Sequence, residues 1–221
     1  MWYFAGDAGL AQSADRADVL RTLDSLETGQ LPGHDRCLDG TGPSGVDASV
    51  WRDKVRAAVV SEPAVAERTT RPGHLTGSAL VVDESGERLV VLFHRKLQRW
   101  LQPGGHADGD HRLASVALRE AAEETGLGRL AVWSRPIDVD VHRVTPPGED
   151  GHDHFDVRFL VLAPEGGRLR GNHESEEIRW IGFDQLDSID ADVSLRRLVA
   201  GGRATFDRLS AAGRLPRVCR S

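Results

Sequence analysis

Residues 104–127 restrict the possible folds more than any other segment of the chain. Two glycines at 104 and 105 mark a turn, and a helical pattern then runs from Asp110 to Gly126. Asp110 is suited to cap the first turn, and Gly126 to end the helix in the left-handed conformation. The apolar positions recur at helical spacing and form one stripe: Leu113, Val116, Ala117 and Ala121. The pattern predicts a helix with one buried face.

Strand-like sequences occur on both sides of this helix. They are alternating or continuous apolar runs at 75–83, 89–95, 136–144, 154–163 and 178–183. A second helix is predicted over 194–213, with a break at the glycine pair Gly201–Gly202. Strands that enclose one helix and precede another predict an α/β fold, a mixed-sheet sandwich.

The first part of the chain has a different pattern. Residues 1–14 show no periodicity and are expected to be poorly ordered. Two short amphipathic helices are predicted, one at 15–27 and one from Asp47 to just before Pro63. A Gly/Pro-rich linker at 29–45 joins them.

The apolar residues of each short helix lie on one face: Val19, Leu20, Leu23 and Leu26, then Val50, Val55 and Val59. Neither helix can bury that face alone, so both should pack on the sandwich or on a second subunit. We therefore divide the chain into a helical N-terminal extension with its linker at 1–65 and a main domain at 66–221.

Charge and cysteine content narrow the function classes. The net charge is −6 and the isoelectric point is near 5.8, so the basic surface needed for coating nucleic acid is missing. No apolar run approaches the ~20 residues of a membrane span. Cys37 and Cys219 are far apart and form no disulfide framework or zinc spacing. We expect a cytoplasmic protein without nucleic-acid or membrane partners.

Three glutamates on the predicted helix point to a metal site. On a helical wheel, Glu120 and Glu124 fall about 20° either side of Leu113. Glu123 falls beside Val116, so all three carboxylates are expected on the inward face. Glutamates at this spacing more often form a solvated charge run. Clustered, half-buried carboxylates repel one another and lose hydration, however, and a divalent cation such as Mg²⁺ or Mn²⁺ removes both penalties.

Neighbouring residues fit the same hypothesis. Arg119 lies one turn before Glu123 and is expected to hold that carboxylate in place. The glycines at 104 and 105 let the backbone approach a ligand closely, so the Gly104 carbonyl could complete a metal shell. The segment offers few nucleophiles of its own. Water, activated by a metal and a carboxylate base, is then the expected attacking group.

The same segment resembles the signature of the Nudix hydrolases. That signature reads Gly, five residues, Glu, seven residues, Arg-Glu, an aliphatic residue, any residue, Glu-Glu, any residue, Gly, an aliphatic residue. The matching positions are Gly105, Arg119, Glu120, Ala121, Glu123, Glu124, Gly126 and Leu127. The preceding WLQPGGHAD is similar to the lead-in of a bacterial branch of this family, and the resemblance covers roughly residues 70–215.

The resemblance implies a Nudix-type α/β/α sandwich that hydrolyses a diphosphate linkage in a nucleoside diphosphate linked to another moiety X. It implies that Glu120 and Glu124 bind Mg²⁺ or Mn²⁺, and that Glu123 binds metal or acts as the base. The Gly104 carbonyl would complete the metal shell, and Arg119 belongs to the catalytic set. Family members often add an acid from a later loop, which here offers Glu174, the preferred residue, and also Glu176 and Glu177.

The partner implied is a small-molecule diphosphate, a nucleotide in the first instance. ADP-ribose, damaged nucleoside triphosphates, dinucleotides and sugar nucleotides all stay open as substrates, and a homodimer stays open as the assembly. An isomerase reaction on the same fold, like that of isopentenyl diphosphate isomerases, uses a cysteine in the site. Neither Cys37 in the linker nor Cys219 in the tail suits that role.

One position departs from the signature, because His111 stands where the family has Glu. In one interpretation the position is outside the metal shell, and Asp110 supplies the negative charge near the helix N-terminus. In the other, the chain is a catalytically inactive Nudix-fold module that binds a ligand or regulates. The intact set of Arg119, Glu120, Glu123 and Glu124 favours the first.

A second polar surface is predicted on the strands at 136–144 and 154–163. If these strands pair as a hairpin with apolar residues opposite apolar ones, the polar residues share one face. They are Asp138, Asp140, His142, His154, Asp156 and Arg158. This face is either the solvent side of a half-buried hairpin, or a substrate wall or second metal site, because histidines and carboxylates together suit metals.

Overall fold

The computed structural model describes residues 1–26, 48–145, 148 and 150–218. The predicted linker at 29–45, the cap at Asp47 and both cysteines lie outside these residues. The helices are α1 (Arg16–Asp24), α2 (Ala48–Ser61), α3 (Leu113–Thr125) and α4 (Val193–Ala211), with 3-10 segments η1 (Ala8–Leu10) and η2 (Phe183–Ile189). The strands are β1 (Trp2–Phe4), β2 (Gly73–Asp83), β3 (Arg88–His94), β4 (Arg99–Leu101), β5 (Gly104–His106), β6 (Ala131–Val144), β7 (His152–Ala163) and β8 (Ser175–Gly182).

In the described part of the chain, these strands form one mixed sheet in the order β1-β6-β7-β2-β3-β4. The short strand β5 pairs with β2, and β8 pairs with β3. The neighbours β2 and β7 run parallel, whereas the hairpins β2–β3 and β6–β7 are antiparallel. The mixed α/β sheet predicted from the sequence is confirmed.

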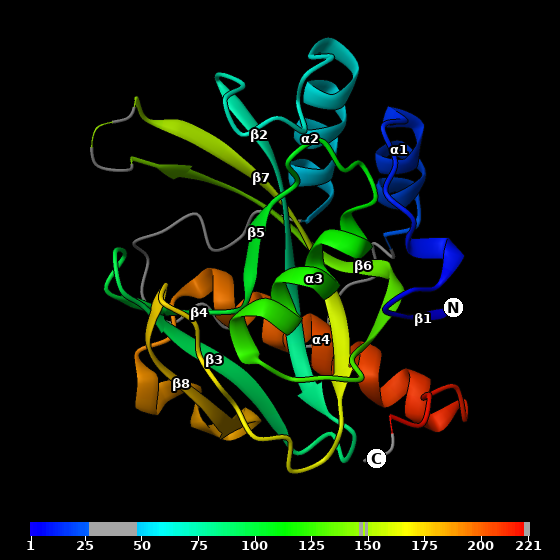
Figure 1. Ribbon diagram of the computed structural model, residues 1–221, viewed down its shortest axis with the longest axis vertical. Coiled ribbons are helices and arrows are strands. Elements are labelled where there is room, and N and C mark those ends of the chain that lie inside the picture. The colour runs from blue at the N-terminus through cyan, green and yellow to red at the C-terminus, as the bar shows by residue number, and fades with distance from the viewer. Residues whose placement is uncertain (27–47, 146–147, 149, 219–221) are drawn as a thin grey trace.

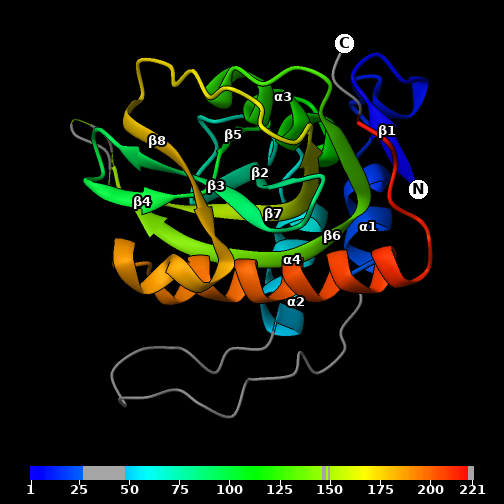
Figure 2. The same ribbon diagram turned by 90° about the horizontal axis from the view of Figure 1, so that it is seen from below.

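Helices cover both faces of this sheet, with α3 on one side and α4 on the other (Figures 1 and 2). Alternate residues of β2 pack in the two cores on either side of the sheet, because successive side chains of a strand point to opposite faces. Leu75, Ala79 and Val81 pack in the core beneath α3. Leu80 and Val82 pack in the core beneath α4. The result is an α/β/α sandwich, as predicted.

The short helices α1 and α2 pack into the same core as α3. Val19 and Leu23 of α1 and Val55 and Val59 of α2 are almost fully buried there. The prediction that Val50 is also buried is wrong, since its side chain is 55% exposed. The division of the chain after residue 65 stays a prediction.

The expectation that residues 1–14 are poorly ordered is wrong, because they form β1 and η1. Trp2–Phe4 form β1, which pairs antiparallel with Ala131–Trp133 at the edge of the sheet. The Trp2 and Trp133 ring centroids lie 5.5 Å apart. Side-chain packing at an unpaired sheet edge explains why so short a strand forms there.

The predicted break at Gly201–Gly202 is also wrong, because α4 continues through the glycine pair. A Cβ on Gly202 would overlap the Leu80 side chain of β2, so glycine lets the helix approach the sheet closely. Among the described helices, none combines the length and apolar character required to cross a membrane.

Candidate active site

The apolar stripe of α3 fixes how the glutamates are presented. Leu113, Val116, Ala117 and Ala121 are fully buried against the sheet, as predicted. The strand β5 pairs with residues 76–78 of β2 directly beside α3. The turn glycines at 104 and 105 therefore lie alongside the second half of the helix.

Glu124 and Glu120 approach these glycines closely. Glu124 is 3% exposed, and its Oε2 accepts a hydrogen bond of 2.8 Å from the Gly104 N–H. A Cβ on Gly105 would lie 2.5 Å from the Glu120 carboxylate, so a larger residue at that position would displace this carboxylate. The glycine turn thus forms a cradle around two carboxylates.

Both carboxylates are destabilised in their charged form. Burial raises the pKa of Glu124 to about 8, and the neighbouring Glu120, Glu174 and Glu123 charges add to the rise. Burial also raises the pKa of Glu120, against the opposing effect of Arg119. Crowded carboxylate oxygens of this kind are the donors that Mg²⁺ and Mn²⁺ prefer.

Two details of the predicted glutamate face are wrong. Glu123 is exposed rather than inward, because it lies about 80° from Leu113 on the wheel, at the border of the buried stripe. Arg119 does not hold Glu123. Its guanidinium instead donates to Glu120 Oε1 and to the His106 carbonyl, both at 3.0 Å.

Of the three acids in the later loop, Glu174 alone lines the cavity in front of α3. Its charge raises the pKa values of Glu120 and Glu124, so it is close enough to act on both. Glu176 accepts a hydrogen bond from Gln98 instead, and Glu177 pairs with Arg179. This placement agrees with the preference for Glu174.

His111 lies away from this cavity and faces the N-terminal segment. Its backbone N–H donates to the Ser13 carbonyl at 2.7 Å, and its ring Nδ1 lies 3.3 Å from the same oxygen. The prediction that Asp110 caps the helix is wrong, because Arg112 is the N-cap residue. Asp110 instead accepts hydrogen bonds from the Ser13 and Arg112 N–H groups. The 110–112 segment therefore anchors the N-terminal extension.

The cavity itself has a volume of about 1080 Å³. One wall contains Gly104, Gly105 and Glu120, and another contains polar residues of β2, β6 and β7. Positive side chains also line it: Arg68, Arg71, Arg95, Lys96 and Arg99. The cavity is thus wide enough for a nucleotide-sized ligand and carries cations suited to phosphate groups.

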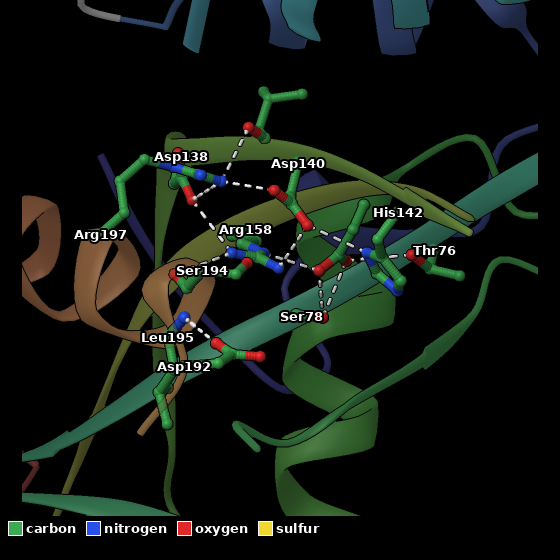
Figure 3. A network of polar contacts seen from close by, with 12 residues as sticks. Thr76, Ser78, Asp138, Asp140, His142, Arg158, Asp192, Ser194, Leu195 and Arg197 are labelled. Atoms are coloured by element: carbon green, nitrogen blue, oxygen red, sulfur yellow. Dashed lines mark hydrogen bonds and ion pairs between the residues drawn. The ribbon is translucent and has the colours of Figure 1, made fainter. Parts of the chain in front are cut away.

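The β6–β7 hairpin pairs in the predicted register, with His142 opposite His154 and Asp140 opposite Asp156. The interpretation of its polar face as a solvent face is wrong, because four of its side chains are buried. Arg158 lies among them and pairs with three carboxylates at 2.7 to 3.1 Å (Figure 3): Asp138, Asp140 and Asp156.

Further groups complete this network. Arg197 of α4 donates to Asp138 and Asp140, and Ser78 of β2 donates to Asp156 (Figure 3). Burial alone would raise the pKa of Asp140, but bonds to His142 and Arg197 and the Arg158 charge hold it well below its usual value. The carboxylates compensate the Arg158 charge, and the network forms a polar wall of the cavity.

Sequence reasoning missed that β2 contributes to the same wall. His74 lies beside His154 in the parallel pairing, and Thr76 lies opposite His106 of β5. The signal was present, because His74, Thr76 and Ser78 are polar residues at alternate positions of a strand. Burial lowers the pKa of His106 to about 4 and that of His154 to about 2. The Arg68 charge adds to the first effect, and the surrounding histidines add to the second.

Comparison with known proteins supports the resemblance. The model of the NUDIX domain matches residues 73–201, more than half of the chain. Two Mycobacterium tuberculosis proteins are each 30% identical to this chain. One has the provisional name "mutator protein MutT4" and matches over 52% of this chain and 45% of its own length. The other has the provisional name "8-oxo-dGTP diphosphatase 3" and matches over 58% of this chain and 56% of its own length.

The chain thus spans about half the length of these curated relatives. Among solved structures, a NUDIX-family hydrolase from Clostridium perfringens superposes with a TM-score of 0.51 at 18% identity, covering 60% of this chain and 97% of that one. A C. elegans Ap4A hydrolase gives a TM-score of 0.50 at 15% identity, covering 61% and 98%. At identities this low, the two superpositions show a shared fold and nothing more. The match to the domain model over more than half of the chain shows that the chain belongs to the Nudix family.

Proposed function

We propose that this chain hydrolyses a diphosphate linkage in a nucleoside diphosphate linked to another moiety X, in a reaction that depends on Mg²⁺ or Mn²⁺. The observation that carries the proposal is the pair Glu120 and Glu124. These carboxylates are crowded and at least partly buried, and the pKa of each is raised. Glu120 also faces a cavity that is lined by arginine and lysine side chains. Such a pair is costly unless a divalent cation binds it.

Glu120 and Glu124 would hold the metal ion, with Glu174 from the facing loop and the Gly104 carbonyl as further ligands. When bound, the ion supplies Lewis-acid polarisation of the diphosphate oxygens and lowers the pKa of water. Membership of the Nudix family supports this use of the helix. The Gly104 N–H already fixes one oxygen of Glu124 and leaves its other oxygen free for this role.

Glu123 is the proposed base, or a further metal ligand. Its exposure at the border of the buried stripe leaves its carboxylate accessible to solvent water. Attack of that water on one phosphorus breaks the bridging P–O bond and leaves two phosphorylated products. Arg119 acts as a positioning residue, because it orients Glu120 and ties it to the β5 carbonyl at His106.

The cationic rim of the cavity would bind the two phosphates of the substrate. Among the residues that the structure describes, the Arg95 and Arg99 side chains have polar contacts of 3.5 Å, to Ser175 and Asp192 respectively. Contacts this long leave both guanidinium groups available for a ligand. The names of relatives and neighbours, an 8-oxo-dGTP diphosphatase and an Ap4A hydrolase, support a nucleotide as the substrate class. The position of His111 against Ser13 argues against the inactive-module alternative, because its departure from the signature removes no group from the cavity.

The test is a screen of ADP-ribose, a dinucleotide polyphosphate, an oxidised nucleoside triphosphate and a sugar nucleotide. Each is incubated with Mg²⁺, with Mn²⁺ and with chelator, and the phosphorus-containing products are identified by ³¹P NMR. We expect metal-dependent cleavage between phosphorus atoms of at least one substrate. Glu120→Gln should lower kcat by about 100-fold or more, the scale for loss of one electrostatic catalytic group. Absence of cleavage throughout the screen would refute the proposal.

A further inference from the structure

Histidines from three strands gather on one wall of the cavity. His74 of β2, His106 of β5 and His154 of β7 have ring centroids 5.0 to 5.2 Å apart. The parallel register of β2 and β7 sets His74 and His154 side by side, and the pairing of β5 with β2 brings His106 to the same place. The sheet itself therefore builds this cluster, on the polar side of strands whose other side is core.

Two of these rings carry a buried nitrogen that has no partner. The Nε2 atoms of His74 and His154 are inaccessible to solvent and make no hydrogen bond with any residue the structure describes. Buried polar atoms are normally paired, and leaving one unpaired is unfavourable. Two such atoms lie within a single cluster, where they are available to bind a ligand.

The spacing of the rings fits one metal ion. One ligand nitrogen from each of the three histidines lies within 4.8 Å of the other two. Three points this close share a centre no more than about 2.8 Å from each, whereas a zinc–nitrogen bond is about 2.0–2.1 Å. Side-chain adjustments of less than about 1 Å would therefore complete the site.

We propose that His74, His106 and His154 bind one divalent transition-metal ion, with Zn²⁺ the best match. Three imidazoles suit zinc, copper, iron or nickel, whereas Mg²⁺ and Mn²⁺ prefer the oxygen ligands of the glutamate site. This site is separate from the glutamate site and lines the same cavity. A three-histidine zinc site leaves one position for water or a phosphate oxygen of a ligand in that cavity.

Arg68 would compete with a metal ion for His106. Its guanidinium donates to Nδ1 of His106 at 2.7 Å. If Nδ1 binds the metal, its lone pair is no longer available to accept the hydrogen bond from Arg68. If Nε2 binds the metal, the ring proton lies on Nδ1, which then cannot accept a hydrogen bond either. Metal binding through either nitrogen must therefore displace Arg68. The Arg68 side chain is 58% exposed and lies 3.7 Å from Asp108, which gives it another partner.

The experiment uses the full chain without a histidine tag, stripped of metal by chelation. Zn²⁺ binding is measured by isothermal titration, and the ligand set is examined by the visible absorption of bound Co²⁺. We expect one tight site and a Co²⁺ spectrum of low coordination number. His106→Gln and His154→Gln should each raise Kd by more than about 100-fold, because even loss of an outer partner of a ligand costs about 10- to 100-fold.

Three further variants identify the site. His111→Gln is the matched control, since His111 is also buried with an unpartnered Nε2 but lies outside the cluster, and it should bind Zn²⁺ like wild type. Glu120→Gln should also retain the Zn²⁺ site. Arg68→Gln should lower Kd by roughly 3- to 10-fold, because one competing hydrogen bond is removed. Misfolding could explain weaker Zn²⁺ binding by a histidine variant, but it could not explain tighter binding by Arg68→Gln.

Three results would overturn the proposal: no Zn²⁺ or Co²⁺ binding by the wild type, binding lost in Glu120→Gln but retained in His106→Gln, or no change in Arg68→Gln. If His154→Gln does not fold by circular dichroism, His106→Gln decides, because His106 lies on a short strand and is only partly buried. None of these measurements depends on hydrolysis, so they test the zinc site independently of the substrate screen.

Discussion

Replacing Glu124 by Gln is expected to remove a large pH-dependent loss of stability from the metal-free protein. The carboxyl has a pKa of about 8 when folded, against an ordinary value of 4.5. Between these values the folded state binds the proton and the unfolded state has released it, so the free energy of unfolding falls as pH rises through this window. Glutamine keeps an oxygen for the Gly104 N–H and carries no charge.

The size of this change in the free energy of unfolding follows from the pKa shift of Glu124. Each pKa unit corresponds to about 1.36 kcal/mol, so the full shift is worth at most about 5 kcal/mol. Between about pH 6 and pH 9, linkage gives a loss of roughly 2–3 kcal/mol in the wild type that Glu124→Gln does not suffer. The variant should therefore be more stable than wild type at the upper end of this range.

The assay is urea unfolding in chelator, followed by tryptophan fluorescence, at several pH values in this window. Glu123→Gln is the matched control, because it removes one carboxylate from the same helical turn at an exposed position. It should keep most of the wild-type pH dependence, because the Glu123 charge is the smallest of the named contributions to the raised pKa of Glu124. Added Mg²⁺ should stabilise the wild type more than Glu124→Gln. Parallel pH profiles for wild type and Glu124→Gln would refute the electrostatic account of the site.

Three other outcomes are expected. Gly105→Ala should fold but lose more than about tenfold in kcat, because its Cβ would displace the Glu120 carboxylate, whereas Gly128→Ala, with no atom within 4 Å, should retain activity. His111→Ala should keep kcat within about tenfold and lower the free energy of unfolding by about 1 kcal/mol through loss of its contact with Ser13, as kinetics and urea titration would show. Arg158→Met should lower the free energy of unfolding by about 3–5 kcal/mol, since it leaves buried carboxylates uncompensated.

The fold and the glutamate helix could be predicted because their signals are local. The period of the apolar residues in α3 identified its buried face, and Gly126 ends the helix in the left-handed conformation with φ of 66°, as expected. The alternation in β6 and β7 likewise predicted which polar residues share a face. These patterns depend on side-chain direction within one element, which the sequence records directly.

Other features depend on contacts between distant segments, and the sequence does not record them. Trp2–Phe4 form a strand only because the edge of β6 is available. Asp110 and His111 contact Ser13, which is about 100 residues away in the chain, so the helical cap inferred from neighbours was wrong. The histidine cluster needs the parallel pairing of β2 with β7, a register that no local pattern specifies.

We propose that the crowded carboxylates of α3 make this chain a metal-dependent diphosphate hydrolase. The most direct measurement is steady-state turnover of the best substrate from the screen, by wild type and Glu124→Gln side by side, as Mg²⁺ is titrated. We expect saturable activation of the wild type and a loss of about 100-fold or more in kcat for the variant, with an intact fold. Equal turnover by the two proteins, or wild-type turnover that persists in chelator, would show that these carboxylates do not bind a catalytic metal ion.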